Sequence, residues 1–265
     1  MSDMKRLVSI LMWMFLVLSI LVCLYPIVCL ITNSLVHPQE LTGGLPSFLK
    51  TPSAIQYYNA LFRNSDFLRA LFNSLFLSVS ITVGQIVVAI PAAFVLAKYP
   101  SRLGNAIFAL YLVLVLLPYQ VVQLPHYLLL DELGLLNTHR GVIFPQIFSA
   151  LGVCILRQGM GNVDDKILDA ARIDGCGDFR LLVSMVIPDA LPTIVTAAFL
   201  VFLDTWNMVE APLIFINDTE KYPLSVLYNS ISASGTNFAI GIICLLIPFL
   251  LFGLVGERLK EYLEV

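Results

Sequence analysis

Charged residues are scarce in this sequence. Of its 265 residues only 12% are charged and 58% are apolar, and the mean hydropathy is +0.88. A typical soluble domain is roughly 45–50% apolar and about 25% charged, because its surface must stay hydrated. This chain has too few polar groups to cover a water-facing surface of its size. The composition therefore predicts an integral membrane protein and excludes a soluble domain, a disordered chain, a collagen and a disulfide scaffold.

Motifs for catalysis, metal binding and nucleic-acid binding are also missing. The three histidines match no zinc spacing, the five cysteines include no CxxC pair, and there is no GxSxG motif. No lysine follows a glycine anywhere, which excludes the GxxxxGK[ST] phosphate-binding loop. The net charge of −3 favours no nucleic-acid partner. We expect no metal site in this chain, and any energy it uses must come from ion coupling or from another subunit.

Six apolar segments have the composition of membrane-spanning helices, which need about 20 mostly apolar residues. Because every backbone polar group in lipid must be bonded internally, these segments predict an all-α fold with six transmembrane helices. We expect residues 1–265 to form a single transmembrane domain. The predicted spans are residues 7–31, 70–97, 105–126, 141–156, 191–211 and 238–256.

Positive charge is distributed unequally between the connections. With six spans both termini lie on one side, and that side would carry ten of the 15 lysines and arginines. The positive-inside rule then predicts that both termini are cytoplasmic. The first span is too long for the apolar core of a signal peptide and no A-x-A site follows it, so we expect a retained anchor.

The longest predicted cytoplasmic connection, residues 157–190, contains a helix–turn–helix pattern. Carboxylates suit a helix N-terminus, glycines end helices at low cost, and proline cannot continue one. These signals are Asp164 and Asp165 at the first N-terminus, Gly175 and Gly177 at the break, Asp178 as the cap of a second helix, and Pro188 at its end. Two short amphipathic helices suit a groove in a soluble partner. The alternative is a hairpin folded back on its own bundle, and composition leaves both open.

The same segment resembles the EAA motif of ABC importer permeases, with Asp169 in place of the consensus glutamate and Cys176 in place of the alanine after the glycine. In that family the loop is the coupling helix that docks on the ATPase subunit. The ATPase-coupling residues that the resemblance implies are Asp169, Ala170, Ala171, Asp174, Gly175, Phe179 and Pro188.

Further motifs are similar to carbohydrate permeases, most closely the maltose-type second permease subunit, over roughly residues 70–260. They are Asn73-Ser74-Leu75, Leu133-Gly134-Leu135-Leu136-Asn137-Thr138, Leu156-Arg157-Gln158, Trp206-Asn207 and Pro212-Leu213-Ile214. The resemblance implies a type I ABC importer permease fold in a prokaryotic plasma membrane. It also implies import of a sugar by alternating access. The implied partners are a second permease, two ATPase subunits that hold ATP and Mg, and an external solute-binding protein. No catalysis and no cofactor are expected in this chain itself.

Polar residues inside predicted spans are candidates for a transport pathway, because an ionised carboxylate in hydrocarbon is costly. Asp204 and Glu210 fall in the predicted fifth span, and helical spacing would put Trp206 one turn from Glu210. An aromatic ring beside carboxylates suits a sugar, and the alternative is a structural hydrogen bond to the partner permease. The candidate pathway residues are Asp204, Trp206, Asn207, Glu210, Gln120 and Gln123. The two glutamines could equally lie at a wet interface.

Three other functions remain as alternatives at this stage. The first is a permease of the same architecture for a non-sugar solute. The second is a membrane-embedded enzyme that uses Asp204 and Glu210 as a carboxylate pair, although six residues of helix would place them about 240° apart. The third is an ion-coupled transporter that acts alone, which the absence of an ATPase partner would identify.

Overall fold

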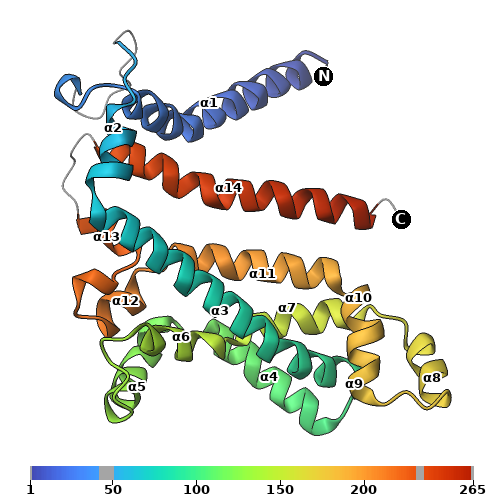
Figure 1. The fold of residues 1–265 in the computed structure, drawn as a ribbon. Coiled ribbons are helices and arrows are strands. Elements are labelled where there is room, and N and C mark those ends of the chain that lie inside the picture. The colour runs from blue at the N-terminus through green and yellow to red at the C-terminus, as the bar shows by residue number, and fades with distance from the viewer. Residues whose placement is uncertain (1, 42–50, 231–235, 264–265) are drawn as a thin grey trace. The chain divides into compact units, whose positions relative to one another are not determined.

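The computed structural model describes residues 2–41, 51–230 and 236–263, and every regular element in these ranges is a helix (Figure 1). The chain forms two compact units, which are described separately: Met1–Leu68 with Tyr228–Ile247, and Arg69–Leu227 with Pro248–Val265. The predicted all-α membrane fold is confirmed. Three helices are long and apolar enough to span a membrane, and six spans result when each of three bent helix pairs counts as one.

The three long helices are α1 (Ser2–Ser34), α3 (Ser65–Lys98) and α14 (Thr236–Leu263). The bent pairs are α4 (Arg102–Leu116) with α5 (Tyr119–Glu132), α6 (His139–Ile147) with α7 (Ala150–Gly161), and Asp178–Asp189 with α11 (Leu191–Trp206). The shorter α-helices are α2 (Ile55–Tyr58), α8 (Asp165–Ile173), α9 (Asp178–Leu181), α10 (Ile187–Asp189), α12 (Glu210–Phe215) and α13 (Leu224–Ser230). Short 3₁₀ segments lie at Pro38–Glu40 and Thr219–Lys221, and π-helical segments at Asn59–Arg63 and Leu182–Val186.

Three of the helices expected to be continuous are broken. The one expected over residues 141–156 is interrupted between Ile147 and Ala150, where α6 and α7 meet at a bend of 40°. The one expected over residues 105–126 bends by 100° at Pro118, because proline has no backbone N–H and forces Leu117 into an extended conformation. The one expected over residues 191–211 ends at Trp206, and Glu210 begins α12 instead. The helical spacing assumed between Trp206 and Glu210 is therefore wrong, and so is the 240° separation between Asp204 and Glu210.

In the first unit, the end of α1 is bonded to α2 by a buried glutamine. The Gln56 Nε2 atom donates to the carbonyls of Asn33 at 2.7 Å and Val36 at 2.6 Å. The hydroxyl groups of Ser34 and Tyr57 lie 2.9 Å apart. These bonds satisfy carbonyls that the end of α1 leaves without helical partners.

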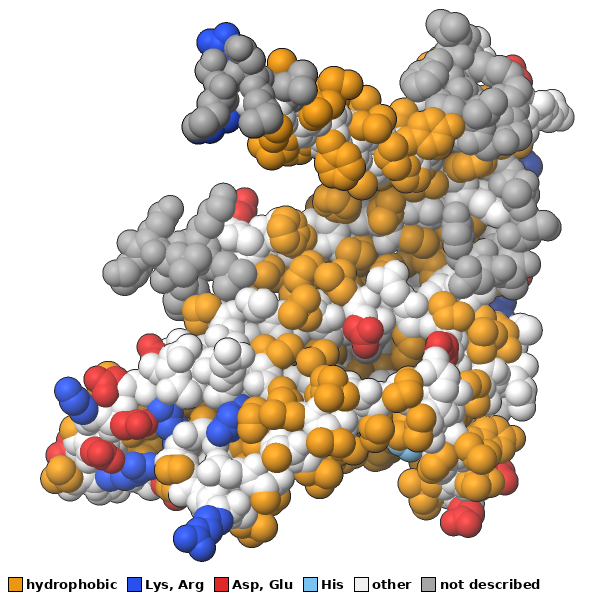
Figure 2. Space-filling view, turned by 180° about the vertical axis from the view of Figure 1, so that it is seen from behind, with side chains coloured by type: hydrophobic (Ala, Val, Ile, Leu, Met, Phe, Trp, Pro, Cys, Tyr) orange, Lys and Arg blue, Asp and Glu red, His pale blue; other side chains and the backbone are white. Residues whose placement is uncertain are grey.

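In the second unit, α3, α4, α7 and α11 lie side by side (Figure 1). Small residues allow close packing: Ala89 and Ala93 of α3 and Ala197 of α11 are buried in one apolar cluster with Leu156 and Met160 of α7. The same cluster continues into α8 through Leu168 and Ala171. Figure 2 shows apolar side chains spread along the helices and charged side chains gathered at the end formed by α8 and α9.

Candidate functional site

The predicted helix–turn–helix is present as α8 and α9. The Asp164 carboxylate accepts a hydrogen bond from the backbone N–H of Lys166 at 2.9 Å and caps α8. The helix ends at Gly175, whose φ of +83° is the left-handed conformation that glycine adopts without strain. Gly177, in an extended conformation, is the N-cap of α9, so the cap predicted at Asp178 is wrong by one residue.

The second helix does not end at Pro188 as predicted. It runs from Asp178 through Pro188 to Asp189, and the chain then bends by 78° before α11. A proline removes the hydrogen bond to the residue four positions before it. A π turn at Leu182–Val186 precedes this proline, and there the Ile187 N–H bonds to the carbonyl of Leu182, five residues back.

The two helices present large apolar side chains to solvent, and we call residues 164–189 the elbow. Ile173 is 87% exposed and Phe179 is 80% exposed, whereas Leu168 and Ala171 face the bundle and are buried. Of the other predicted coupling residues, those exposed are Asp169, Ala170, Asp174, Gly175 and Pro188. Residues 164–189 lie in the connection predicted to be cytoplasmic, and an exposed apolar surface in water indicates a protein-binding site.

Two residues that the sequence did not single out hold the elbow to the end of α3. The Lys98 ammonium is buried, with 2% of the side chain exposed, and donates to Asp165 at 2.7 Å and to the Val163 carbonyl at 2.6 Å. The Tyr99 hydroxyl donates to the carboxylate of Asp178. The hydrogen bond and charge of Lys98 hold the pKa of Asp165 below its usual value.

Arg172 adds a contact between α8 and the same end of α3. Its guanidinium lies 5.2 Å from the centre of the Tyr99 ring and pairs with Asp169 at 2.9 Å. Tyr99 therefore contacts both arms of the elbow, α8 through its ring and α9 through its hydroxyl. In the sequence, Lys98 and Tyr99 show only the end of an apolar run, and nothing local to them indicates these contacts.

Three of the six predicted pathway residues come together at the two helix breaks. The Gln120 Nε2 atom lies 3.1 and 3.3 Å from the two Glu210 carboxylate oxygens, and the Gln123 Nε2 atom lies 3.1 Å from one of them. Both glutamines come from the first turns of α5, just after Pro118, and Glu210 opens α12. We call these three residues the polar cluster, and Glu210 is exposed within it.

The other three predicted pathway residues lie elsewhere. Trp206 is 6% exposed and stacks on Phe202 with ring centroids 5.7 Å apart, so its ring belongs to the core. The Asn207 side chain donates to the Leu203 carbonyl at 2.8 Å and closes the end of α11. Asp204 is exposed on α11.

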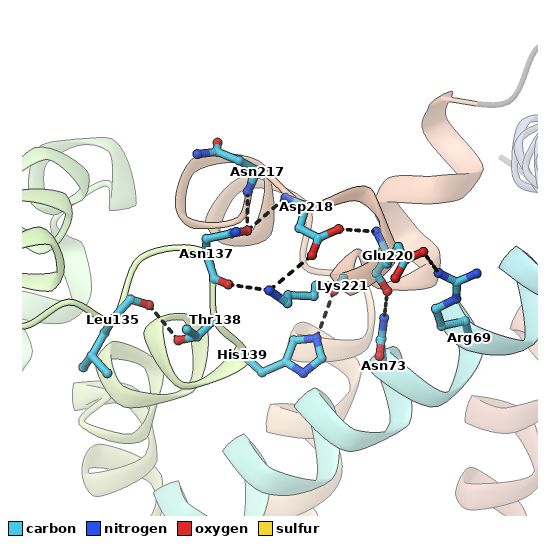
Figure 3. Close-up of polar contacts among 10 residues, drawn as sticks. All are labelled: Arg69, Asn73, Leu135, Asn137, Thr138, His139, Asn217, Asp218, Glu220 and Lys221. Atoms are coloured by element: carbon cyan, nitrogen blue, oxygen red, sulfur yellow. Dashed lines mark hydrogen bonds and ion pairs between the residues drawn. The ribbon is translucent and has the colours of Figure 1, made fainter.

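At the other end of the second unit, two loops distant in sequence are joined through Asn137 (Figure 3). Asn137 has a φ of +58°, which asparagine tolerates better than most residues. Its Oδ1 atom accepts hydrogen bonds from the N–H groups of Asn217 at 3.1 Å and Asp218 at 2.9 Å, and its carbonyl accepts from Lys221 at 3.0 Å. The N–H of Glu220 and the charge of Lys221 lower the pKa of Asp218. The Leu133–Thr138 motif is thus part of a rigid loop pair.

The beginning of α3 is bonded to the same loop pair. Arg69 forms an ion pair with Glu220 at 2.7 Å, and the Asn73 Nδ2 atom donates to the carbonyls of Glu220 at 2.9 Å and Tyr222 at 3.1 Å (Figure 3). At the next residue, the Ser74 hydroxyl accepts from the N–H of Leu224 at 2.7 Å. The Asn73-Ser74 motif therefore connects α3 to residues 220–224.

A bundle of straight and broken spans with an exposed elbow between two of them is the architecture of a membrane transport subunit. The family model described as "Binding-protein-dependent transport system inner membrane component" matches residues 85–264, and the chain belongs to this family. This confirms the resemblance to importer permeases.

Several relatives are similar over most of their length. The arabinooligosaccharides transport system permease protein AraQ of Bacillus subtilis is 32% identical over 84% of this chain and 81% of its own length. The sn-glycerol-3-phosphate transport system permease protein UgpE of Rhizobium meliloti is 27% identical over 77% of this chain and 75% of its own. A chain of a bacterial ABC transporter involved in the import of the acidic polysaccharide alginate has the same fold, with a TM-score of 0.80, 21% identity and 96% coverage of both chains.

Proposed function

We propose that this chain is a permease subunit of an ATP-driven ABC importer that moves a sugar or oligosaccharide into the cytoplasm by alternating access. The observation that carries the proposal is the exposed apolar elbow in a family member whose own sequence has no phosphate-binding loop. The proposed assembly contains a second permease, two ATPase subunits with ATP and Mg, and an external solute-binding protein. This chain itself is non-catalytic, and both termini lie on the cytoplasmic side of a prokaryotic plasma membrane.

In this proposal the elbow is the docking site of the ATPase. Ile173 and Phe179 insert into a groove of the ATPase, with Asp169, Asp174 and Pro188 around them. Nucleotide-driven closure of the two ATPases would move the elbow and its counterpart on the second permease, and the cavity between the permeases would change its access. The contacts of Lys98 and Tyr99 with both helices of the elbow support this role, because they fasten the elbow to the end of α3.

The polar cluster is proposed to line the pathway. A carboxylate exposed beside two amides offers acceptors and donors that suit hydroxyl groups, and lipid would be a costly environment for it. Among the described residues, Glu210 is the only charged side chain in the hydrogen bonds of the cluster. Its negative charge disfavours anionic solutes. Asp204, exposed on α11, is proposed to face the same pathway or the second permease.

Relatives leave two solute classes open. The similar permeases carry names for arabinooligosaccharides, for polygalacturonan and rhamnogalacturonan, and for sn-glycerol-3-phosphate. Glu210 favours a neutral oligosaccharide among these. A phosphorylated or otherwise non-sugar solute is the second candidate, and it is favoured only by the relatives named for glycerol phosphate.

The test is gentle purification of the complex, identification of every copurified chain, and reconstitution in liposomes. We expect an ATPase and a second permease to copurify, and the loaded binding protein to stimulate ATP hydrolysis and uptake of a neutral oligosaccharide. Uptake of glycerol phosphate instead would show that the transported solute belongs to the second, non-sugar class. Uptake by the isolated chain, driven by an ion gradient, would overturn it.

A further inference from the structure

Helix α3 is bonded by polar side chains at both of its ends, and to different parts of the second unit. It has 34 residues and therefore extends over about 51 Å. It runs without a break past Pro91, whereas α4–α5 and α6–α7 are bent. Its beginning is bonded to residues 220–224 and its end to the elbow.

The contact at the elbow is built around a buried cation. A buried ammonium group is costly unless acceptors surround it. The Lys98 Nζ atom has three: the Asp165 carboxylate at 2.7 Å and the carbonyls of Val163 at 2.6 Å and Gly161 at 3.4 Å. These acceptors come from the turn between α7 and α8 and from the first residue of α8. If α8 moved away from α3, the Lys98 ammonium would lose its carboxylate partner Asp165.

A second cation fixes the same end of α3 to α7. The Arg157 Nε atom donates to the Leu96 carbonyl at 3.1 Å, and its guanidinium lies 3.7 Å from the centre of the Phe108 ring of α4. With Tyr99 bonded to Asp178, the end of α3 contacts α7, α8 and α9. Below these polar contacts, Leu168 and Ala171 of α8 pack in the same buried cluster as α3.

We propose that α3 is the rigid connection that relays displacement of the elbow to residues 217–224 at the far end of the unit, with Lys98 and Tyr99 as the positioning residues that engage it. The inference rests on the proposed function, because the displacement is the one that the ATPase would impose. It adds a route from the elbow to the loops that Asn137 joins. Bound partners at either end would then be linked through one helix.

The experiment uses the reconstituted complex of the full chain with its partner subunits and measures uptake per ATP hydrolysed. Lys98→Met keeps most of the side-chain length and removes the charge, and Tyr99→Phe removes one hydroxyl group. Each should lower uptake per ATP about tenfold, the scale of a lost hydrogen bond to a charged group. Lys98→Arg should restore part of the loss. Lys5→Met, at an exposed lysine of α1 outside the elbow, is the matched control and should leave the ratio unchanged.

The ratio of uptake to ATP hydrolysed distinguishes a loss of positioning from a loss of stability. A partly unfolded permease loses uptake and stimulated hydrolysis together, so its ratio stays the same. At the other end, Ser74→Ala should lower the ratio in the same direction, although Ser74 lies far from the elbow along α3. If Lys98→Met fails to assemble, Tyr99→Phe and Ser74→Ala decide the question. Wild-type coupling in these two variants would overturn the relay and leave the proposed function intact. A wild-type chain that copurifies with no ATPase would overturn both.

Discussion

The elbow exposes apolar side chains, whereas the polar cluster exposes a carboxylate. In both, the exposed side chains are unsuited to the solvent expected around them. The elbow lies in the connection predicted to be cytoplasmic, where water would be the solvent, yet it exposes Ile173 and Phe179 almost completely. The polar cluster lies where two predicted spans are broken, yet it exposes the carboxylate of Glu210. Each surface is in the wrong solvent for its side chains.

The difference indicates two kinds of missing partner. Exposed apolar side chains gain free energy when a protein groove covers them, about 25 cal/mol for each Å² removed from water. An exposed carboxylate at the spans gains nothing from apolar contact, and it needs water, a polar solute or a polar neighbouring chain. The elbow therefore suits a soluble protein, whereas the polar cluster suits a hydrated pathway. Variants that remove the apolar side chains of the elbow or the charge of the polar cluster test this difference.

The largest effect is expected at the elbow. Replacing Ile173 and Phe179 together with serine should weaken binding to the ATPase by about 10²–10⁴-fold, because burial of each side chain is worth about 1.5–3 kcal/mol. Titration of the purified permease complex with the ATPase measures this. Leu103→Ser removes a leucine that is 71% exposed on α4 and serves as the control. Equal binding by the double variant and the control would remove the elbow from the interface.

The next effect is expected at the polar cluster. Glu210→Gln preserves size and removes charge, and it should lower uptake of a neutral oligosaccharide roughly 10–100-fold, since hydrogen bonds to charged groups contribute about 1.5–3 kcal/mol. Binding of the ATPase should not change, because the elbow is untouched. Glu132→Gln, at an exposed carboxylate ending α5, is the control. Undiminished uptake by Glu210→Gln would assign the cluster to contact with the second permease.

A smaller effect separates stiffness from surface chemistry within the elbow. Gly175→Val forces a β-branched residue into the left-handed region at a cost of about 1–2 kcal/mol, and uptake per ATP should fall roughly 5–30-fold. Gly177→Val is the matched control, because Gly177 has an ordinary φ of −75° and open space where a Cβ would lie. If both variants couple normally, the geometry of the turn does not matter to transport.

The sequence predicted the elbow well because its signals are local. A capping carboxylate at Asp164 and a left-handed glycine at Gly175 act within a few residues, and the family motif covers the same segment. The second end was predicted within one residue, because the helix ends at Asp189 directly after Pro188. The π turn at Leu182–Val186 was not predicted, and no local pattern of residues indicates it.

The polar cluster could be predicted only in part because its residues meet across elements. Gln120, Gln123 and Glu210 were each identified as polar residues in apolar runs, but their convergence required the breaks at Pro118 and after Trp206. Trp206 was misassigned since an aromatic ring near a carboxylate in sequence need not share its surroundings. Lys98 was counted only as a positive charge at the end of a span, although its acceptors lie more than 60 residues away.

The smallest expected effect is the pH dependence of the anchor beneath the elbow. Because Lys98 holds the pKa of Asp165 below its ordinary value of 3.8, the ion pair stabilises the folded chain fully at neutral pH and loses this contribution as pH falls through the lowered pKa. The stability difference between wild type and Asp165→Asn should therefore stay constant from about pH 7 to about pH 5 and shrink below about pH 4, measured as the midpoint of thermal unfolding. Asp165 is 77% exposed, so the difference is small. Equal midpoints for wild type and Asp165→Asn at neutral pH would mean that Lys98 does not depend on this carboxylate, and that the backbone carbonyls of Gly161 and Val163 hold it.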